Sequence, residues 1–210
     1  MKPLTLSLRA ALVTAFGLAL GACAVDTGDA DQAAQAVRAD PCPSPMPSGA
    51  VAGTSLTPAA DQTLAFVFHA VGTQNYVCNA AGTGWTFVGP RADLLDDHHH
   101  VVGTHFASAA GPTRPEWRFR DGSAVIMARA SGVTVSSTAV PWLLLNAVSY
   151  EGAGRFSEIT SIQRLSTVGG VAPSAPCTAG ASSSVPYEAD YFFYRTNDDD
   201  DRSRQCRSAP

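Results

Sequence analysis

The sequence predicts an all-β fold: a single-domain β-sandwich or barrel-like sheet with long loops, braced by disulfides. Between residues 61 and 195, segments rich in β-branched and aromatic residues alternate with turn residues at a spacing of about eight to twelve positions. No segment of this region combines the 3.6-residue apolar period of an amphipathic helix with capping residues. Short, regularly spaced strands of this kind are typical of sandwiches and barrels.

The first half of the region contains β-rich runs separated by glycine-containing turns. A run of β-formers ends at Gly72, and another follows the turn sequence Gly82-Thr83-Gly84. Asp121-Gly122 is a tight-hairpin signal because both residue types favour the turn conformations that join antiparallel strands. We therefore expect strands at residues 64–71, 74–78, 85–88, 92–96, 101–106, 116–120 and 123–130.

The second half continues the pattern, with strands expected at residues 133–138, 141–150, 155–165 and 185–195. The densest apolar run after the N-terminus lies here, at Leu143, Leu144, Leu145 and Val148. We expect a hairpin that turns at residues 151–154 and directs its apolar side, with Leu144, into the core. The four residues 142–145 are also compatible with one helical turn, and that alternative stays open.

The N-terminus has the features of an export signal. Lys2 and Arg9 precede an apolar run at residues 10–20, which has the length of a signal-peptide core. Leu20-Gly21-Ala22-Cys23 resembles a bacterial lipobox, so we expect removal of residues 1–22 and acylation of Cys23. Ala24, rather than Asp, follows the cysteine, and the resemblance to proteobacterial lipoproteins then implies anchoring in the outer membrane rather than the inner membrane. The alternative is an ordinary secretory signal that happens to contain a cysteine.

The rest of the chain divides by composition into three parts. Residues 23–60 are rich in Ala, Asp, Pro, Ser and Gly and are expected to form a flexible tether. Residues 61–195 form the β-rich domain. Residues 196–210 contain four consecutive aspartates followed by three arginines and are expected to be a polar tail rather than a calcium site. The expected location is therefore the cell envelope, outside the cytoplasm.

Four cysteines remain after Cys23, and an even number in an oxidising compartment predicts two disulfides. We favour Cys78–Cys177 within the β-rich domain and Cys42–Cys206 between its flanks. A bond between Cys177 and Cys206, which are close in sequence, is the serious competitor. Unpaired buried thiols are the remaining alternative.

Composition excludes several classes of function. The chain carries a net charge of −4 and no basic stripe, so nucleic acid is not an expected partner. Beyond Lys2 the chain has no lysine, which excludes a Schiff-base lysine, a phosphate-loop lysine and a Ser-Lys dyad. The common hydrolase, metalloprotease, thiol-redox and dinucleotide-binding motifs are also missing. No cofactor is expected.

Several motifs together resemble a family of secreted bacterial and fungal proteins, domain of unknown function 3455. The motifs lie at residues 72–78, 85–90, 103–106, 117–123, 140–145, 162–170 and 189–194. The resemblance covers residues 62–195 and implies an extracytoplasmic β-rich domain without an established activity. The chain departs from the family pattern at His98 and His99, where a glycine-containing turn is usual, and at residues 107–115, which are lengthened.

One cluster has the residue types of a metal site. Asp96, His98 and His100 lie on one face if the segment is a strand, and imidazole with carboxylate suits zinc or copper. A turn at residues 97–99 would separate these side chains. We favour an exposed histidine-rich turn, with the metal site as the alternative.

A second set of residues offers acid–base chemistry. His105 and Asp121 are a possible base and orienting group, with Ser123 as nucleophile. Ser123 follows Asp121 at the spacing of any Asp-Gly-Ser hairpin, however, so the pattern has little specificity. An enzyme of unrecognised type acting through His105, Asp121 and Arg164 is our alternative hypothesis for function.

Aromatic side chains are numerous for a small domain, and they suggest a ligand pocket as an alternative to an ordinary core. The candidate ligand-binding residues are His105, Trp117, Trp142, Gln163 and Arg164. Core packing, with Arg164 paired to Glu158 or Asp190, is the simpler interpretation and the one we favour. The preferred hypothesis for function is a lipid-anchored, non-enzymatic envelope protein, which binds a small molecule or another envelope component or has a structural role.

Overall fold

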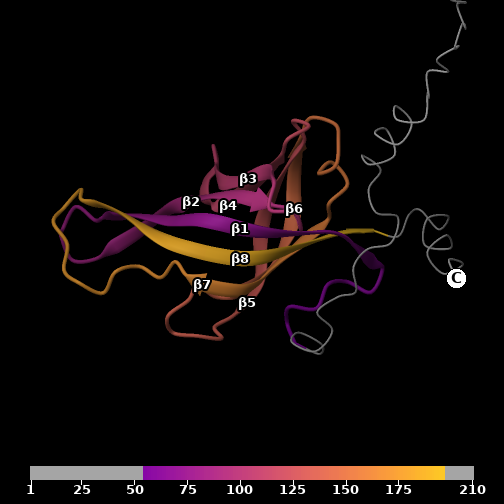
Figure 1. The fold of residues 1–210 in the computed structure, drawn as a ribbon. Helices are drawn as coiled ribbons and strands as arrows, with labels where there is room; N and C mark the ends of the chain where they lie inside the picture. The colour runs from indigo at the N-terminus through magenta and orange to yellow at the C-terminus, as the bar shows by residue number, and fades with distance from the viewer. Residues whose placement is uncertain (1–53, 197–210) are drawn as a thin grey trace, which may run out of the picture. The chain divides into compact units, whose positions relative to one another are not determined.

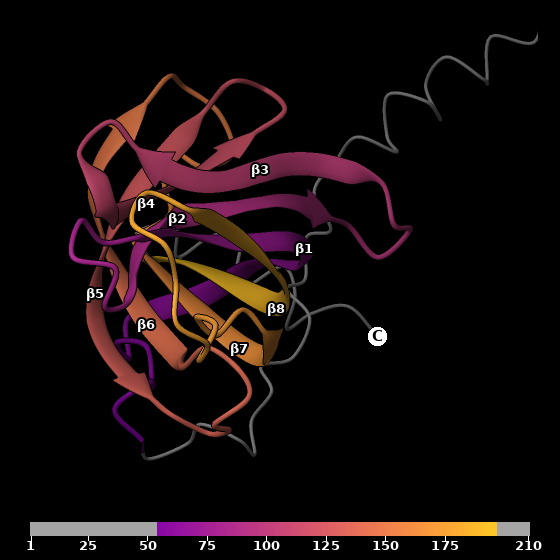
Figure 2. The ribbon, with the colours of Figure 1, turned by 90° about the vertical axis from the view of Figure 1, so that its left-hand side faces the viewer.

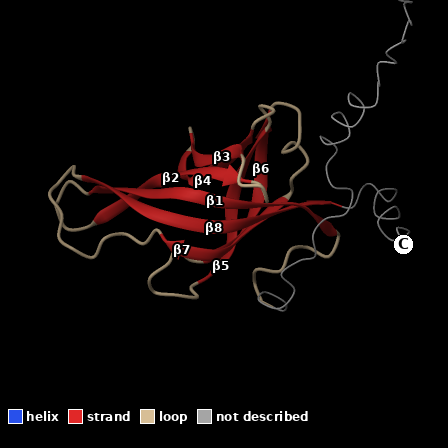
Figure 3. Cartoon of the chain, viewed as in Figure 1, coloured by secondary structure: helices blue, strands red, loops and turns tan. Residues whose placement is uncertain are grey.

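The computed structural model describes residues 54–196 and contains strands and loops but no helix within that range (Figure 3). Its strands are β1 (Gln62–Cys78), β2 (Trp85–Leu95), β3 (Val101–Ser108), β4 (Gly111–Phe119), β5 (Ala124–Val133), β6 (Trp142–Glu151), β7 (Ser161–Gly169) and β8 (Ser182–Thr196). The all-β prediction is confirmed. No helix in the described range is long and apolar enough to span a membrane.

The eight strands form one closed antiparallel barrel (Figures 1 and 2). Each strand pairs with the next in sequence, and β1 pairs with β8 along most of its length, which closes the sheet. Closure gives every strand two neighbours, although β4 and β5 pair only over Glu116–Arg118 and Ala124–Ile126. Eight strands enclose a space that side chains or one small ligand can fill. Of the two architectures expected, the barrel is therefore the observed one.

β1 is one long strand where the sequence predicted two. The sequence predicts a strand end at Gly72, but this residue pairs with Ala92 on β2 and Tyr187 on β8. A Cβ atom at this position would lie 2.1 Å from the carbonyl oxygen of Arg91. Glycine is present because the neighbouring strand passes too close for any side chain. The two strands predicted at residues 85–88 and 92–96 are likewise one strand, β2.

The second half of the barrel differs from prediction at its loops. Residues 134–138 form a connection rather than a strand, and residues 152–160 form a long loop before β7 begins. Residues 142–145 are strand, so the helical-turn alternative is wrong. Strands β6 and β7 do pair as a hairpin, with Leu143 opposite Arg164 and Leu145 opposite Ile162.

The side chains of β6 contradict the expectation that Leu144 points into the core. Leu145 is 2% exposed and belongs to the main core, whereas Leu144 is only partly buried and packs on the outer face of the sheet. Val148 is exposed. The alternation of side chains along a strand permits only every second residue to face inward, so the apolar run of residues 143–145 is shared between the two faces.

Aromatic side chains fill one end of the barrel, here called the phenylalanine end. The loop after β6 inserts Phe156, which is fully buried and stacks on Phe193 at a centroid distance of 4.8 Å. Phe66, Phe68 and Phe119 surround Phe156 at centroid distances of 5.3–6.4 Å. The connections β1–β2, β3–β4, β5–β6 and β7–β8 lie at the opposite end, here called the cavity end.

The folded domain begins before the boundary at residue 61 that composition suggested. Leu56 is 1% exposed and packs on the outer face of the barrel with Leu64, Leu165, Phe192 and Tyr194. The carbonyl oxygen of Leu56 accepts a hydrogen bond from Nε2 of Gln163 at 2.6 Å. A single leucine in a polar segment gives no periodic signal, so the sequence pattern could not reveal this contact.

A disulfide joins Cys78, at the end of β1, to Cys177 in the β7–β8 connection, and confirms the predicted pairing. It therefore ties two connections of the cavity end together. Cys23, Cys42 and Cys206 lie outside the described residues, as do the signal peptide, the tether up to residue 53 and the tail from residue 197.

Candidate functional site

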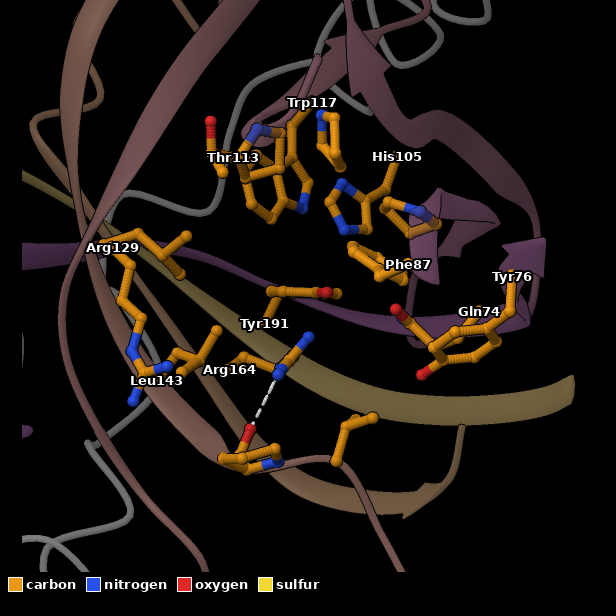
Figure 4. A pocket seen from close by; sticks show the side chains of 16 residues that line it. Gln74, Tyr76, Phe87, His105, Thr113, Trp117, Arg129, Leu143, Arg164 and Tyr191 are labelled. Carbon is orange, nitrogen blue, oxygen red and sulfur yellow. Dashed lines mark hydrogen bonds between the residues drawn. The ribbon is translucent and has the colours of Figure 1, made fainter. Parts of the chain in front are cut away.

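A cavity of about 340 Å³ opens at the cavity end of the barrel (Figure 4). Pockets of this size accept small organic molecules. Its wall is mostly apolar, with a few polar groups placed among aromatic, proline and leucine side chains. The lining residues are Gln74, Tyr76, Phe87, Pro90, His105, Pro112, Thr113, Pro115, Trp117, Arg129, Val140, Pro141, Leu143, Leu145, Arg164 and Tyr191.

The two-residue period of the strands presents these side chains to the interior. On β4, Thr113, Pro115 and Trp117 line the cavity in succession, and on β6 Leu143 and Leu145 do the same. Residues between them face outward. Most of the wall is therefore built on strands, which hold its geometry more firmly than loops would, while Val140 and Pro141 come from the connection between β5 and β6.

An aromatic group forms part of the wall nearest the core. His105 stacks on Trp117 with ring centroids 4.0 Å apart and planes 11° apart, and Tyr191 meets both rings edge-on at 5.3 Å. Nδ1 of His105 lies 3.0 Å from the carbonyl oxygen of Glu116. Since a carbonyl only accepts, Nδ1 carries the proton and Nε2 is left as an acceptor.

His105 is neutral at ordinary pH. Burial disfavours the imidazolium and lowers its pKa to about 3, and the charge of Arg164 acts in the same direction, against the hydrogen bond to Glu116. The histidine therefore contributes a ring face and one hydrogen-bond acceptor rather than a charge.

Two hydrogen-bond donors in the wall have no partner among residues 54–196. Nε2 of Gln74 and Nε1 of Trp117 are buried without a protein acceptor, and their residues are 2% and 1% exposed. A buried donor without an acceptor costs about 1–3 kcal/mol, so such groups are rare unless they serve a purpose. Both atoms belong to residues that line the cavity.

Arg164 supplies the charge of the site. Its Nε and Nη2 donate to the carbonyl oxygen of Pro141 at 3.1 and 2.8 Å (Figure 4). Burial raises the pKa of Tyr187 and Tyr191, and the guanidinium opposes that rise through its charge and hydrogen bonding. The two tyrosine hydroxyls contact each other and remain neutral.

The predicted ion pair of Arg164 is wrong on both alternatives. Glu158 pairs with Arg195, and Asp190 pairs with His69 on the outside of the barrel. Within residues 54–196, no carboxylate lies at ion-pair distance from Arg164. The sixteen lining residues contain Arg129 as a second cation and no acid, so the cavity is positively charged.

Three of the five residues proposed for ligand binding lie together in this cavity: His105, Trp117 and Arg164. Gln163 and Trp142 do not. Gln163 points outward, where it bonds the carbonyl oxygen of Leu56 and accepts a hydrogen bond from Tyr194. Trp142 packs on the outer cluster. Both are neighbours of an inward-facing residue, and the sequence did not reveal which of two adjacent positions faces inward.

Several lining residues were missed by the sequence analysis, in particular Gln74, Phe87, Arg129 and Leu143. Gln74 and Tyr76 share the inward face of β1 by simple alternation. That signal was available once Gly72 was taken as part of the strand. The contribution of Arg129 depends on closure of the barrel, which local sequence does not encode.

Asp121 and Ser123 do not line the cavity. Asp121 accepts hydrogen bonds from the backbone and hydroxyl of Ser123 and from the backbone of Arg155. The Ser123 hydroxyl in turn accepts a hydrogen bond from the backbone of Phe156. These bonds hold the loop that closes the phenylalanine end. The proposed pairing of His105 with Asp121 is therefore wrong, because His105 bonds Glu116 instead.

The histidine-rich segment is a turn. Oδ1 of Asp96 accepts hydrogen bonds from the backbones of His98 and His100, while His99 adopts a positive φ of 62°. The side chains of His98 and His100 are largely exposed. The strand geometry on which the metal-site alternative rested is not present. No group of three or more potential ligand side chains that could hold a metal ion occurs in the described range.

The fold and the cavity define a closed β-barrel with a pocket of ligand size. The family model described as "Protein of unknown function (DUF3455)" matches residues 58–195, and the chain belongs to this family. Searches of curated proteins and of solved structures found no match.

Proposed function

We propose that this protein is a lipid-anchored envelope protein whose barrel binds a small organic molecule in the cavity, without catalysing its conversion. The observation that carries the proposal is the pair of partnerless donors, Gln74 Nε2 and Trp117 Nε1, in the wall of a 340 Å³ pocket. A core that only packs has no reason to retain both donors. A binding site does, because its ligand satisfies them.

Two further observations favour binding over catalysis. The acid–base set of the alternative hypothesis is divided, since Asp121 is engaged at the phenylalanine end. His105 in the cavity has a pKa of about 3 because of burial. A group with so low a pKa is a poor general base near neutral pH.

Native mass spectrometry of the full chain, extracted in mild detergent from its own host, tests the proposal. We expect a fraction of the protein to carry a non-covalent small molecule that is released on denaturation. A Leu143→Arg variant, which fills the cavity, should lose that molecule, whereas Val148→Arg on the exposed face of β6 should keep it. Equal retention by both variants would contradict binding in the cavity.

The anchor is proposed from the lipobox-like residues at Cys23. We expect the chain to incorporate radiolabelled palmitate in its bacterial host, and Cys23→Ala to abolish incorporation because the diacylglycerol attaches through that thiol. Cys42→Ala is the matched control and should be labelled normally. Fractionation of the labelled wild type on a density gradient should recover it with the outer membrane. Undiminished labelling of Cys23→Ala would rule out this anchor.

A further inference from the structure

We propose that the ligand is an organic anion whose charged head group binds Arg164 and whose apolar body lies against Trp117 and Leu143. This inference rests on the proposed function and names the class of molecule that the cavity selects. It is carried by three features of the wall: an uncompensated cation, donors without acceptors, and rigid apolar surfaces.

The first feature is charge. Arg164 is half-buried, and its neighbours in the cavity are neutral: the His105 imidazole, the Tyr191 hydroxyl and the carbonyl oxygen of Pro141. Charged groups that are removed from water are normally paired. Since no carboxylate of the described residues pairs with it, the missing counter-charge fits a ligand. Arg129, more exposed at the rim, adds to the same positive potential.

The second feature is the type of the unmatched groups. The indole nitrogen of Trp117 can only donate, and the partnerless atom of Gln74 is its amide nitrogen. Nε and Nη2 of Arg164 donate to the carbonyl oxygen of Pro141, and the guanidinium also hydrogen-bonds the hydroxyls of Tyr187 and Tyr191, so these partners of Arg164 are all neutral. Acceptor oxygens satisfy all of these groups, and charge-assisted hydrogen bonds to an anion are the strongest available. A cationic ligand would be repelled by the guanidinium groups of Arg129 and Arg164, and it would offer hydrogen-bond donors where the wall needs acceptors.

The third feature is the remainder of the wall, which is apolar and stiff. Four prolines line the cavity, at positions 90, 112, 115 and 141, and none has a backbone N–H to offer. Leu143 and the aromatic rings complete this surface. Burial of an aromatic or hydrocarbon body against this surface favours binding, because apolar surface is removed from water. A sugar or a peptide would leave its hydroxyl or amide groups without partners.

Isothermal titration calorimetry with matched probes tests the proposal on the full chain. 2-Naphthoate, 2-naphthamide and 2-naphthylmethylamine share one apolar body and carry an anionic, a neutral and a cationic head. We expect naphthoate to bind at least tenfold more tightly than naphthamide, and the amine not to bind measurably, because only the anion pairs with Arg164. This comparison needs no variant, so it does not depend on a variant folding.

Variants then show which residue binds the charged head group. Arg164→Gln should weaken naphthoate by about tenfold to a hundredfold and leave naphthamide within about twofold. Arg91→Gln, which removes the same charge from an exposed position of β2 outside this cavity, should leave both unchanged.

The outcomes separate the two levels of the proposal. Equal binding of naphthoate and naphthamide, with loss of both in Leu143→Arg, would overturn the anion and keep the cavity as a binding site. No binding of any probe, together with no bound molecule in native mass spectrometry, would overturn both. A larger loss of naphthoate binding from Arg91→Gln than from Arg164→Gln would overturn the assignment to Arg164.

Discussion

His105 illustrates how the fold decides the chemistry of a residue. In sequence it is a histidine beside a phenylalanine, a pattern that favours a half-buried packing residue over a catalytic base. In the barrel it is 2% exposed, stacked on Trp117 and bonded to the Glu116 carbonyl oxygen. The sequence indicated that this residue was a candidate for the site. Its neutral state depends on burial by strands that are distant in the chain, so no local sequence pattern predicts it.

The buried neutral state of His105 predicts how stability depends on pH. The folded pKa is about 3, whereas an unfolded histidine takes up a proton near pH 6.5. Below pH 6.5 the unfolded chain therefore gains a proton that the folded chain refuses, and stability falls as pH drops toward 3. The contribution is about 1.4 kcal/mol per pH unit.

Urea titrations between pH 4 and pH 7 measure this effect. The free energy of unfolding of the wild type should fall more steeply with decreasing pH than that of His105→Gln, which cannot take up a proton. His98→Gln, in the exposed turn, serves as the control and should follow the wild-type slope. Parallel curves for the wild type and His105→Gln would show that His105 is not held neutral.

At the scale of elements, most strands could be located from composition and turn signals, but their faces could not be assigned. Gln163 and Arg164 are adjacent on β7, yet one bonds Leu56 on the outside and the other lines the cavity. When both faces of a strand carry buried residues, apolar alternation no longer marks the inward side. The outer cluster around Leu56 is the physical reason that Trp142 and Gln163 were assigned to the wrong face.

The β6 strand offers a direct test of this face assignment. Leu145→Ala removes a fully enclosed side chain from the core and should cost about 2–5 kcal/mol. Leu144→Ala acts on a partly buried position of the outer cluster and should cost about 1 kcal/mol. Urea midpoints of the two variants give the comparison. A larger loss for Leu144→Ala would mean that the inward face of β6 has been misassigned.

At the scale of the whole molecule, closure of the sheet and the disulfide create the site. The sequence predicted the all-β class and left the sandwich and the barrel open, because pairing between β1 and β8 is a contact between the two ends of the domain. The Cys78–Cys177 bond spans 99 residues and holds the connections at the cavity end. It therefore contributes both to stability and to the shape of the mouth of the cavity.

The entropy of the unfolded chain predicts the cost of removing the disulfide. Cys78→Ala with Cys177→Ala should lower the free energy of unfolding by about 4–5 kcal/mol, since the bond closes a loop of nearly a hundred residues in the unfolded chain. Urea titration without reductant is the measurement, with Cys42→Ala as a variant that leaves this bond intact. An unchanged midpoint in the double variant would show that the bond contributes nothing to stability.

The most direct test of the account is the indole N–H signal of Trp117 in a ¹H–¹⁵N correlation spectrum of the full chain. The sequence contains three tryptophans, which Trp→Phe variants can assign. Trp117 Nε1 has no partner in the part of the chain that the structure describes, while Trp142 packs outside the barrel and provides an internal control. We predict that saturating 2-naphthoate moves the Trp117 signal and leaves Trp142 in place. An unmoved Trp117 signal, or a shift confined to Trp142, would contradict binding of a small molecule within the barrel.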